Sequence, residues 1–221
     1  MRSQAPCRHQ THAVDLAAIY AVPMVPNVLG SAAITARPAT WPDVENLFGI
    51  RGEPSRCWCR WFALPGQDWK ATRPEARKEQ LKAKFGDGGP EPGVLAFRGG
   101  EAVGWCAVEP RECYPRIERS QVLKAAGAGA HDGIGVWSVS CFVVSPGQRR
   151  SGVAAALLAA AVGHAFAHGA GIVEGYPVDP SIRPKAGSAD LYQGTVKLFT
   201  AAGFTIVSTA VPGRAVMRLL R

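Results

Sequence analysis

The chain has 221 residues, of which 47% are apolar and 19% charged, and its formal net charge is +8. This composition excludes global disorder, and the scattered glycines and prolines exclude a collagen-like or low-complexity chain. The length is typical of one domain, or of one domain with a tail. The basic surplus favours a solvated, arginine-rich surface or a phosphate-bearing ligand, because no run of five or more Lys and Arg indicates a nucleic-acid patch.

The first 31 residues lack a clear apolar period, so we expect a flexible N-terminal extension (1–31) followed by one domain over residues 32–221. The uncharged stretch 16–36 invites comparison with a signal peptide or a membrane segment. Pro23 and Pro26 interrupt that stretch, which argues against both. We therefore expect a cytoplasmic protein.

Six cysteines are present, and none forms the C-x-x-C spacing typical of zinc sites and thioredoxin-like motifs. Cys57 and Cys59 are two residues apart, so they point the same way in an extended segment. A metal ion there would need two more ligands, which the neighbouring sequence does not offer. Structural, reduced thiols are favoured over metal or redox use, in agreement with a reducing cytoplasm.

The first predicted strand begins near Ala33, where apolar and polar residues alternate through Pro38. A helix follows, with Thr40 as its N-cap and Pro42 in its first turn, and it ends near Leu47. The domain is therefore expected to open with a strand and a helix.

The segment 52–69 is rich in aromatic residues, with Trp58, Trp61, Phe62 and Trp69 close together. Large aromatic side chains occur both in cores and in ligand pockets. Two interpretations therefore stay open, a local core or an aromatic wall of a substrate pocket. A charged helix is predicted next, from residue 73 or 74 to residue 85, where a Gly-rich stretch ends it.

The remaining elements are predicted from apolar patterns and from the Gly and Pro residues between them. They are a hairpin at 94–97 and 102–108, a short helix at 120–126, a strand at 136–144, a long helix ending at 168, a strand at 172–178, a helix at about 192–202, and strands at 204–208 and 215–220. The order β-α-α-β-β-β-α-β-α-β-β indicates a mixed α/β layer fold.

The sequence Q-R-R-S-G-V-A, at 148–154, lies between the strongest predicted strand and the long helix. The first N–H groups of that helix have no intrahelical partner, and the helix dipole adds partial positive charge, so a pyrophosphate fits there. Gly152 and Ala154 leave room for close backbone approach, and Arg149 and Arg150 can add charge-assisted contacts. The spacing matches neither a Walker loop nor a Rossmann fingerprint.

Two motifs resemble the GNAT superfamily of N-acetyltransferases. F-V-V-S-P at 142–146 with R-x-x-G-x-A at 149–154 is similar to its acyl-CoA motif, and L-F-x-x-x-G-F at 198–204 is similar to the helix before its last hairpin. The stretches G-V-W-S-V-S-C-F and V-E-G-Y-P-V-D resemble a bacterial subgroup without a settled substrate. The resemblance implies a GNAT-like α/β (α+β mixed) fold, with a mostly antiparallel sheet of six to seven strands flanked by about four helices.

The resemblance also implies acetyl-CoA as co-substrate and no metal. The pantetheine arm would lie along the end of the strand, and the Val144 N–H would polarise the thioester carbonyl. The pyrophosphate would lie on the N–H groups of the loop that follows. The implied cofactor-binding residues are Phe142, Val143, Val144, Arg149, Arg150, Ser151, Gly152, Val153, Ala154 and Phe199.

The sequence departs from the family where the catalytic acid is often found, because Phe199 stands in place of a tyrosine and cannot donate a proton. Tyr192 lies about two helical turns before Phe199 and is the candidate acid. Glu174, expected on the strand beside the opening of the sheet, is the candidate base. The candidate substrate-binding residues are Trp58, Trp61, Trp137 and Tyr176.

The expected function is transfer of an acyl group from acetyl-CoA to a primary amine of a small molecule. Two alternatives stay open. One is a non-catalytic acyl-CoA-binding or regulatory module, which Phe199 would suit. The other is an acetyltransferase for aminoacyl-tRNA or protein, which the +8 charge would suit. No DNA or membrane partner is expected, and a homodimer is left open.

Overall fold

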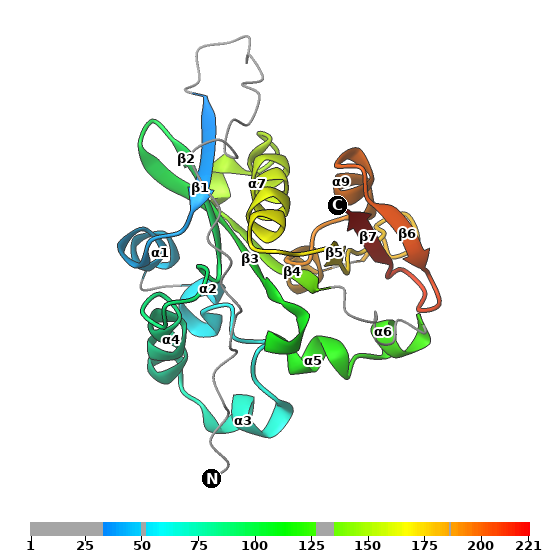
Figure 1. Cartoon of the computed structure of the whole chain (residues 1–221), viewed down its shortest axis with the longest axis horizontal. Helices are drawn as coiled ribbons and strands as arrows, with labels where there is room; N and C mark the ends of the chain where they lie inside the picture. The colour runs from blue at the N-terminus through cyan, green and yellow to red at the C-terminus, as the bar shows by residue number, and fades with distance from the viewer. Residues whose placement is uncertain (1–32, 50–51, 127–134, 186) are drawn as a thin grey trace.

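The computed structural model describes residues 33–49, 52–126, 135–185 and 187–221 (Figure 1). The expected N-terminal extension therefore lies outside the described residues. The sheet has seven strands in the order β1-β2-β3-β4-β5-β7-β6. They are β1 (Ile34–Pro38), β2 (Gly93–Arg98), β3 (Glu101–Pro110), β4 (Val136–Val144), β5 (Ile172–Gly175), β6 (Thr205–Ser208) and β7 (Val216–Leu220). β4 and β5 pair in parallel and the other neighbours are antiparallel, which confirms the expected fold class.

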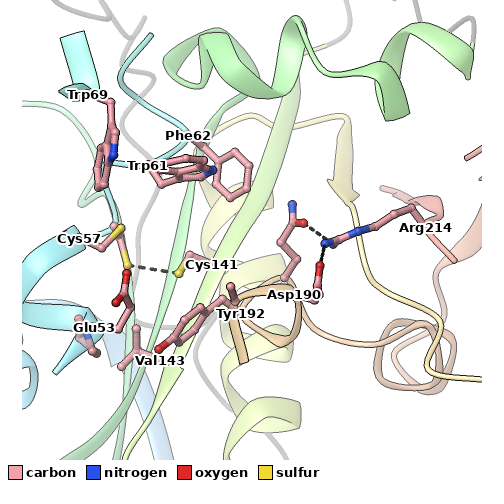
Figure 2. Close-up of a pocket in the computed structure, with 14 residues that line it drawn as sticks. Glu53, Cys57, Trp61, Phe62, Trp69, Cys141, Val143, Asp190, Tyr192 and Arg214 are labelled. Atoms are coloured by element: carbon pink, nitrogen blue, oxygen red, sulfur yellow. Dashed lines mark hydrogen bonds and ion pairs between the residues drawn. The ribbon is translucent and has the colours of Figure 1, made fainter. Parts of the chain in front are cut away.

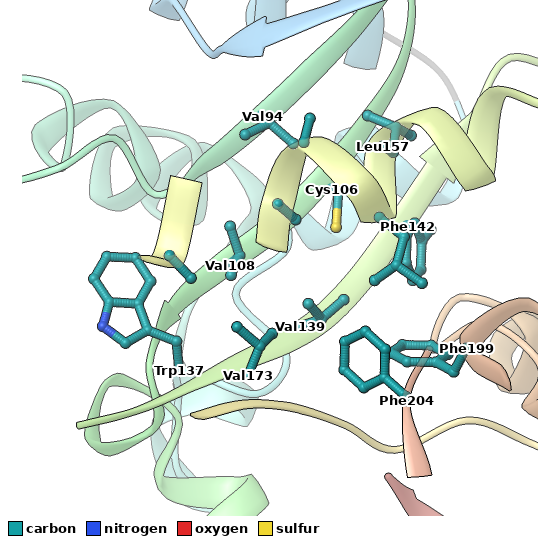
Figure 3. Packing of buried hydrophobic residues seen from close by; sticks show 14 of the residues in the cluster. Val94, Cys106, Val108, Trp137, Val139, Phe142, Leu157, Val173, Phe199 and Phe204 are labelled. Atoms are coloured by element: carbon teal, nitrogen blue, oxygen red, sulfur yellow. The ribbon is translucent and has the colours of Figure 1, made fainter. Parts of the chain in front are cut away.

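Helices lie on both faces of this sheet. They are α1 (Trp41–Phe48), α2 (Glu53–Cys57), α3 (Gly66–Ala71), α4 (Pro74–Ala83), α5 (Pro115–Glu118), α6 (Gln121–Ala125), α7 (Val153–Ala167), α8 (Ser188–Leu191) and α9 (Val196–Ala201). α7 packs across β1 to β5 over the largest apolar cluster (Figure 3). α1, α4 and the residues Trp58 and Cys59 after α2 form a second cluster on the other face, around Trp105.

The start of α7 lies very close to β3. A Cβ atom at Gly104 would be 2.7 Å from Cγ1 of Val153, so only glycine fits there without a shift. Further along the helix, Ala161 and Ala165 are fully buried, which lets the backbone of α7 approach the sheet. This packing fixes where the loop between β4 and α7 lies.

β4 separates from β5 in the middle of the sheet. The parallel pairing ends at Val139 and Gly175. On the other edge of β4, Val139 pairs with Val108 and Cys141 pairs with Ala107, so Ser140 is an extra residue. A bulge of this kind bends a strand and increases its twist. The bulge therefore accounts for an opening between β4 and β5, on the side toward the end of β4.

The predicted helix at 192–202 was wrong in its first half. α8 ends at Leu191, Gly194 has a φ of +77°, and a new N-cap at Thr195 accepts a hydrogen bond from the Leu198 N–H. Residues other than glycine rarely adopt a φ of this value. Tyr192 is therefore in a turn and not on the same helix as Phe199.

In the part of the chain that the structure describes, no helix is both long enough and apolar enough to cross a membrane.

Candidate active site

The open edge of β4 presents backbone amides to the gap beside β5. The Phe142 N–H points away from β3 and donates to the Tyr192 carbonyl at 2.6 Å, whereas the Ser145 N–H donates to Val103 of β3. Since successive residues of a strand alternate in direction, the Val144 N–H faces the same open side as that of Phe142. The Phe142 amide is occupied, so the Val144 amide is the next one toward the loop.

The loop after β4 has the backbone of an anion site. Arg150 and Gly152 have φ angles of +58° and +89°. Among the described residues, the N–H groups of Arg150, Ser151 and Gly152 have no hydrogen-bond acceptor. They adjoin the N-terminus of the 15-residue α7. Successive free N–H groups beside a helix N-terminus suit a pyrophosphate.

The side chains of this loop are also suited to binding an anion. Arg149 and Arg150 are exposed, and neither has a carboxylate partner in the described ranges. A Cβ atom at Gly152 would meet Cδ1 of Ile34 only at 3.7 Å, so the space above the loop is open. The loop therefore fits the diphosphate of acetyl-CoA.

Arg98 of β2 holds the loop in shape, and the sequence contained no signal for this role. One of its terminal nitrogens donates to the Gln148 side chain at 2.7 Å, and the other donates to the Ser151 carbonyl at 3.2 Å. The Ser151 hydroxyl donates to the Gln148 carbonyl at 2.7 Å. Since its side chain is used inside the loop, Ser151 can offer only its N–H to a ligand.

A cavity of about 530 Å³ lies on the face of β4 opposite α7 (Figure 2). Cys141 and Val143 of β4 form part of its wall, whereas Phe142 points to the core under α7. The other lining residues come from segment 53–69, from segment 189–193 and from Arg214. They are Glu53, Pro54, Cys57, Cys59, Trp61, Phe62 and Trp69 on one side, and Ala189, Asp190, Tyr192, Gln193 and Arg214 on the other.

The aromatic segment supplies both a core and a cavity wall. Trp58 is buried and packs on Trp41 and Phe48, so its predicted role in substrate binding finds no support in its position. Trp61 and Trp69 line the cavity, with ring centroids 5.0 Å apart and nearly perpendicular planes. The segment thus contributes Trp58 to the core and Trp61 and Trp69 to the cavity wall, and binding of a substrate to that wall stays a prediction.

Arginines stack on the two tryptophans of the wall. The Arg116 guanidinium lies 3.9 Å from the Trp61 ring centroid, and that of Arg77 lies 3.4 Å from the Trp69 centroid. Arg77 also donates to the carbonyls of Trp69 and Thr72. Cation–π contacts and hydrogen bonds together hold this wall in place.

Two other predicted substrate-binding residues lie elsewhere. The Trp137 ring stacks on His168, and its edge meets His164 of α7. Tyr176 is buried, its hydroxyl 2.8 Å from the Ser138 hydroxyl and 2.6 Å from Glu174. Neither side chain is on the cavity wall, so their assignment to the acceptor stays a prediction that the geometry does not favour.

Glu174 is fully buried in an ion-pair network. Its Oε2 accepts from Nε of Arg218 at 2.6 Å, and its Oε1 lies 3.4 Å from Arg111 and 2.6 Å from the Tyr176 hydroxyl. It does not line the cavity. These contacts join β5 to β7, and they favour an anchoring role over the predicted role as a base.

Tyr192 and Phe199 are separated by the turn at Gly194. The Tyr192 side chain lines the cavity and Phe199 is fully buried, in edge contact with Phe142 and Phe204 (Figures 2 and 3). A Cβ atom at Gly175 would be 2.1 Å from the Phe199 ring, so this ring packs directly on the backbone of β5. Phe199 is a core residue, and its predicted contact with the cofactor stays untested.

Burial raises the pKa of Tyr192, and the nearby Glu53 carboxylate contributes to the same rise. The hydroxyl is therefore protonated at neutral pH and can act as a donor. This fits the role of acid that the sequence suggested.

Asp190, Gln193 and Arg214 line the cavity and were not singled out by sequence analysis, whereas Cys57 and Cys59 were considered as thiols. Arg214 donates to Asp190 and to Gln193, which joins the turn before β7 to the segment around α8. The Cys59 and Cys141 sulfurs are 3.4 Å apart. The pKa of Cys57 is raised to about 12, mainly by burial, so this thiol is protonated. Over the described ranges, no group of three or more His, Cys, Asp or Glu is arranged to hold a metal ion.

Comparisons with known proteins agree with this geometry. Residues 58–183, more than half of the chain, match the model of the acetyltransferase (GNAT) family. No curated protein matches the sequence significantly.

Solved structures share the fold at low sequence identity. The polyamine N-acetyltransferase of Drosophila melanogaster has a TM-score of 0.52 and 12% identity, over 85% of this chain and 100% of that chain. A ribosomal-protein-alanine N-acetyltransferase from Brucella melitensis has a TM-score of 0.49 and 17% identity, over 84% of this chain and 99% of that chain. A putative acetyltransferase from Salmonella typhimurium, solved with its cofactor acetyl-CoA, has a TM-score of 0.48 and 15% identity, over 85% of this chain and 93% of that chain. The family match confirms the resemblance: the chain belongs to the acetyltransferase (GNAT) family and is an acyltransferase.

Proposed function

We propose that the protein is a cytoplasmic, acetyl-CoA-dependent N-acetyltransferase that acts on a primary amine of a small molecule. The observation that carries this proposal is that one strand serves two sites. β4 lines the cavity with Cys141 and Val143, and its end leads into the loop whose free N–H groups suit a pyrophosphate. An acceptor in the cavity would therefore lie beside the strand along which the cofactor is expected.

When bound, acetyl-CoA supplies the thioester whose acetyl group is transferred. Arg149 and Arg150, with the N–H groups of residues 150–154, would hold its diphosphate. The Val144 N–H, on the open side of β4, would donate to the carbonyl oxygen on which negative charge develops. Phe142 and Val143 would contribute backbone at the same edge, although the Phe142 N–H is already bonded to Tyr192.

Tyr192 is proposed as the proton donor. Its side chain is on the cavity wall, and its raised pKa keeps the hydroxyl protonated at neutral pH. A thiolate with the basicity of free cysteine leaves tolerably without an acid, so this donor would assist the reaction without being essential. The ammonium group of the acceptor must first lose a proton, for which solvent water is the acceptor, so that its nitrogen can attack the thioester carbonyl. Holding amine and thioester side by side supplies much of the rate.

The cavity favours a small acceptor over a macromolecule. Its volume of about 530 Å³ and its walls on two sides suit a molecule of small-metabolite size. Trp61, Phe62 and Trp69 offer apolar area to such a molecule. A tRNA acceptor would instead require a phosphate-binding surface and a steep dependence on salt.

A transfer screen tests the proposal. The protein is incubated with acetyl-CoA and a mixed library of amines, and acetylated products are identified by mass. We expect acetylated small amines, with rates that change little between low and moderate salt. Acetyl-CoA binding without transfer to any amine would contradict the proposal and support the regulatory module, whereas strongly salt-dependent transfer to aminoacyl-tRNA would support the macromolecular alternative.

A further inference from the structure

Two carboxylates line the cavity, and they differ in what surrounds them. Asp190 is paired with Arg214, and an Arg183 nitrogen lies 3.6 Å from the same oxygen. Glu53, the first residue of α2, has neither a hydrogen bond nor an ion pair with any residue that the structure describes. Of the two, the exposed Glu53 is the carboxylate whose charge no cation among the described residues neutralises.

Glu53 lines the cavity in which the reacting groups are expected. Val143 of β4 and Tyr192 line the same cavity, and in the view of Figure 2 the Tyr192 ring extends toward the side on which Glu53 lies. Its charge also acts on its surroundings. After burial, which is the main cause, the Glu53 charge contributes to the raised pKa of Tyr192 and of Cys57. The carboxylate is thus within electrostatic reach of the proposed acid and shares the cavity with the cofactor strand.

The aromatic wall cannot supply the same attraction for a cation. Trp61 and Trp69 each already carry a guanidinium on one ring face, from Arg116 and Arg77. Those positive charges weaken the cation–π attraction of the two rings for a second cation. The rings therefore shape the apolar part of the cavity, and an unpaired carboxylate is needed for charge recognition.

We propose that Glu53 binds the ammonium group of the acceptor and makes the enzyme selective for amines that are cationic at neutral pH. The inference rests on the proposed function, since it assigns the acceptor class of the same cavity. A primary alkylamine reaches the enzyme as an ammonium ion, which donates strongly to a carboxylate. Amines that carry a carboxylate next to the nitrogen would be repelled by Glu53.

A pair of ligands that differ in one group tests this selectivity by binding alone. Dissociation constants of 2-phenylethylamine and the uncharged 2-phenylethanol are measured by calorimetry on the protein with CoA present. Since a hydrogen bond between charged groups typically contributes enough free energy for a tenfold to hundredfold change, wild type should prefer the amine by about 10- to 100-fold. Glu53→Gln should lose most of that preference, and Glu53→Asp should keep part of it.

Asp68→Asn is the matched control, because Asp68 is exposed on α3, near the aromatic wall but not on it. This variant removes the same unit of charge and should keep the full preference for the amine. Equal binding of the two ligands by wild type, or an unchanged preference in Glu53→Gln, overturns the role of Glu53. Failure of the proposed function would look different, because wild type would still prefer the amine and yet transfer no acetyl group.

Steady-state kinetics give a second readout for the same variants. For a primary alkylamine, Glu53→Gln should raise KM by about 10- to 100-fold, while the acetyl-CoA affinity stays that of wild type. For an aromatic amine, which is uncharged at neutral pH, KM should change little. A loss that is equal for both amines would point to a structural effect of the substitution and would contradict the proposal.

Discussion

The Phe142 N–H donates to the Tyr192 carbonyl at 2.6 Å, which ties the turn between α8 and α9 to the open edge of β4. This one bond has two consequences. It occupies the Phe142 N–H, which is the first N–H after the bulge at Ser140 to face the open edge of β4. The Val144 N–H is therefore the next one available on that edge, toward the cofactor loop. The bond also fixes the backbone of Tyr192 where its side chain lines the cavity.

The role of Tyr192 is tested by removing its hydroxyl. Tyr192→Phe should lower turnover by about 10- to 100-fold, at the low end of acid–base contributions, because a thiolate leaves tolerably without a donor. The acetyl-CoA affinity should not change. Tyr114→Phe, which removes a buried hydroxyl away from the cavity, serves as the control. Full turnover in Tyr192→Phe would remove Tyr192 from proton transfer.

Glu174→Gln should destabilise the fold. The substitution leaves the buried Arg218 and the nearby Arg111 without their counter-charge, and breaking a buried pair in this way typically costs about 3–5 kcal/mol. Denaturant unfolding measures the loss. Adding Arg218→Gln should recover part of it, because the uncompensated charge is then removed. Unchanged stability together with a large drop in turnover would instead support the predicted role of Glu174 as a base.

The features that could be predicted from the sequence are those whose signals lie within one short segment. β4 was predicted with the residue range that the structure gives it, because its apolar run and the Pro and Gly after it are signals within one segment. The loop at Gly152 was predicted for the same reason. The predicted helix through Tyr192 was wrong because Gly194, with a φ of +77° and its Cα packed against the Phe199 ring, separates α8 from α9.

The cavity could be predicted only in part. Trp58 and Cys59 both adopt positive φ angles, 49° and 47°, which sends Trp58 into the core and leaves Trp61 and Trp69 for the cavity. Nothing in the sequence indicates two consecutive non-glycine residues in that conformation. Glu53 and Arg214 meet at one cavity only through tertiary packing, so neither had a local signal.

Stability should depend on His164 between neutral and acid pH. His164 is fully buried, one ring nitrogen lies 3.0 Å from the Glu91 carbonyl, and burial lowers its pKa from 6.5 to about 4. The unfolded chain binds a proton at this histidine near pH 6.5 and the folded chain only near pH 4. Its contribution is therefore fully present above pH 6.5 and is lost as the pH falls toward 4.

The expected loss from this histidine is about 3 kcal/mol, since one pKa unit corresponds to about 1.4 kcal/mol. Urea unfolding at several pH values measures it. In His164→Leu, the free energy of unfolding should fall less between pH 6.5 and pH 4 than in wild type. Parallel pH profiles of the two proteins would show that His164 does not set this dependence.

Two kinds of substitution test whether the loop binds the cofactor, namely charge reversal at Arg149 and Arg150 and a bulky side chain at Gly152. Arg149→Glu with Arg150→Glu should abolish measurable acetyl-CoA binding in calorimetry, because repulsion replaces two charge-assisted contacts. Gly152→Trp should do the same, since its φ of +89° is unfavourable for a side chain that would also fill the open space above the loop.

Arg73→Glu with Arg119→Glu is the control for the double variant. Both residues are exposed and outside the loop, and the net charge changes by the same amount. This control should bind acetyl-CoA as wild type does, and both double variants should keep their melting temperature. Wild-type affinity in both loop variants would remove the basis of the assigned cofactor site.

The most direct measurement is an experimental structure of the protein with acetyl-CoA. The account predicts the diphosphate on the N–H groups of residues 150–154, the thioester oxygen within hydrogen-bond distance of the Val144 N–H, and the acetyl group at the cavity edge beside Val143. A diphosphate bound away from this loop, or an acetyl group on the α7 face of β4 and out of reach of the cavity, would contradict it.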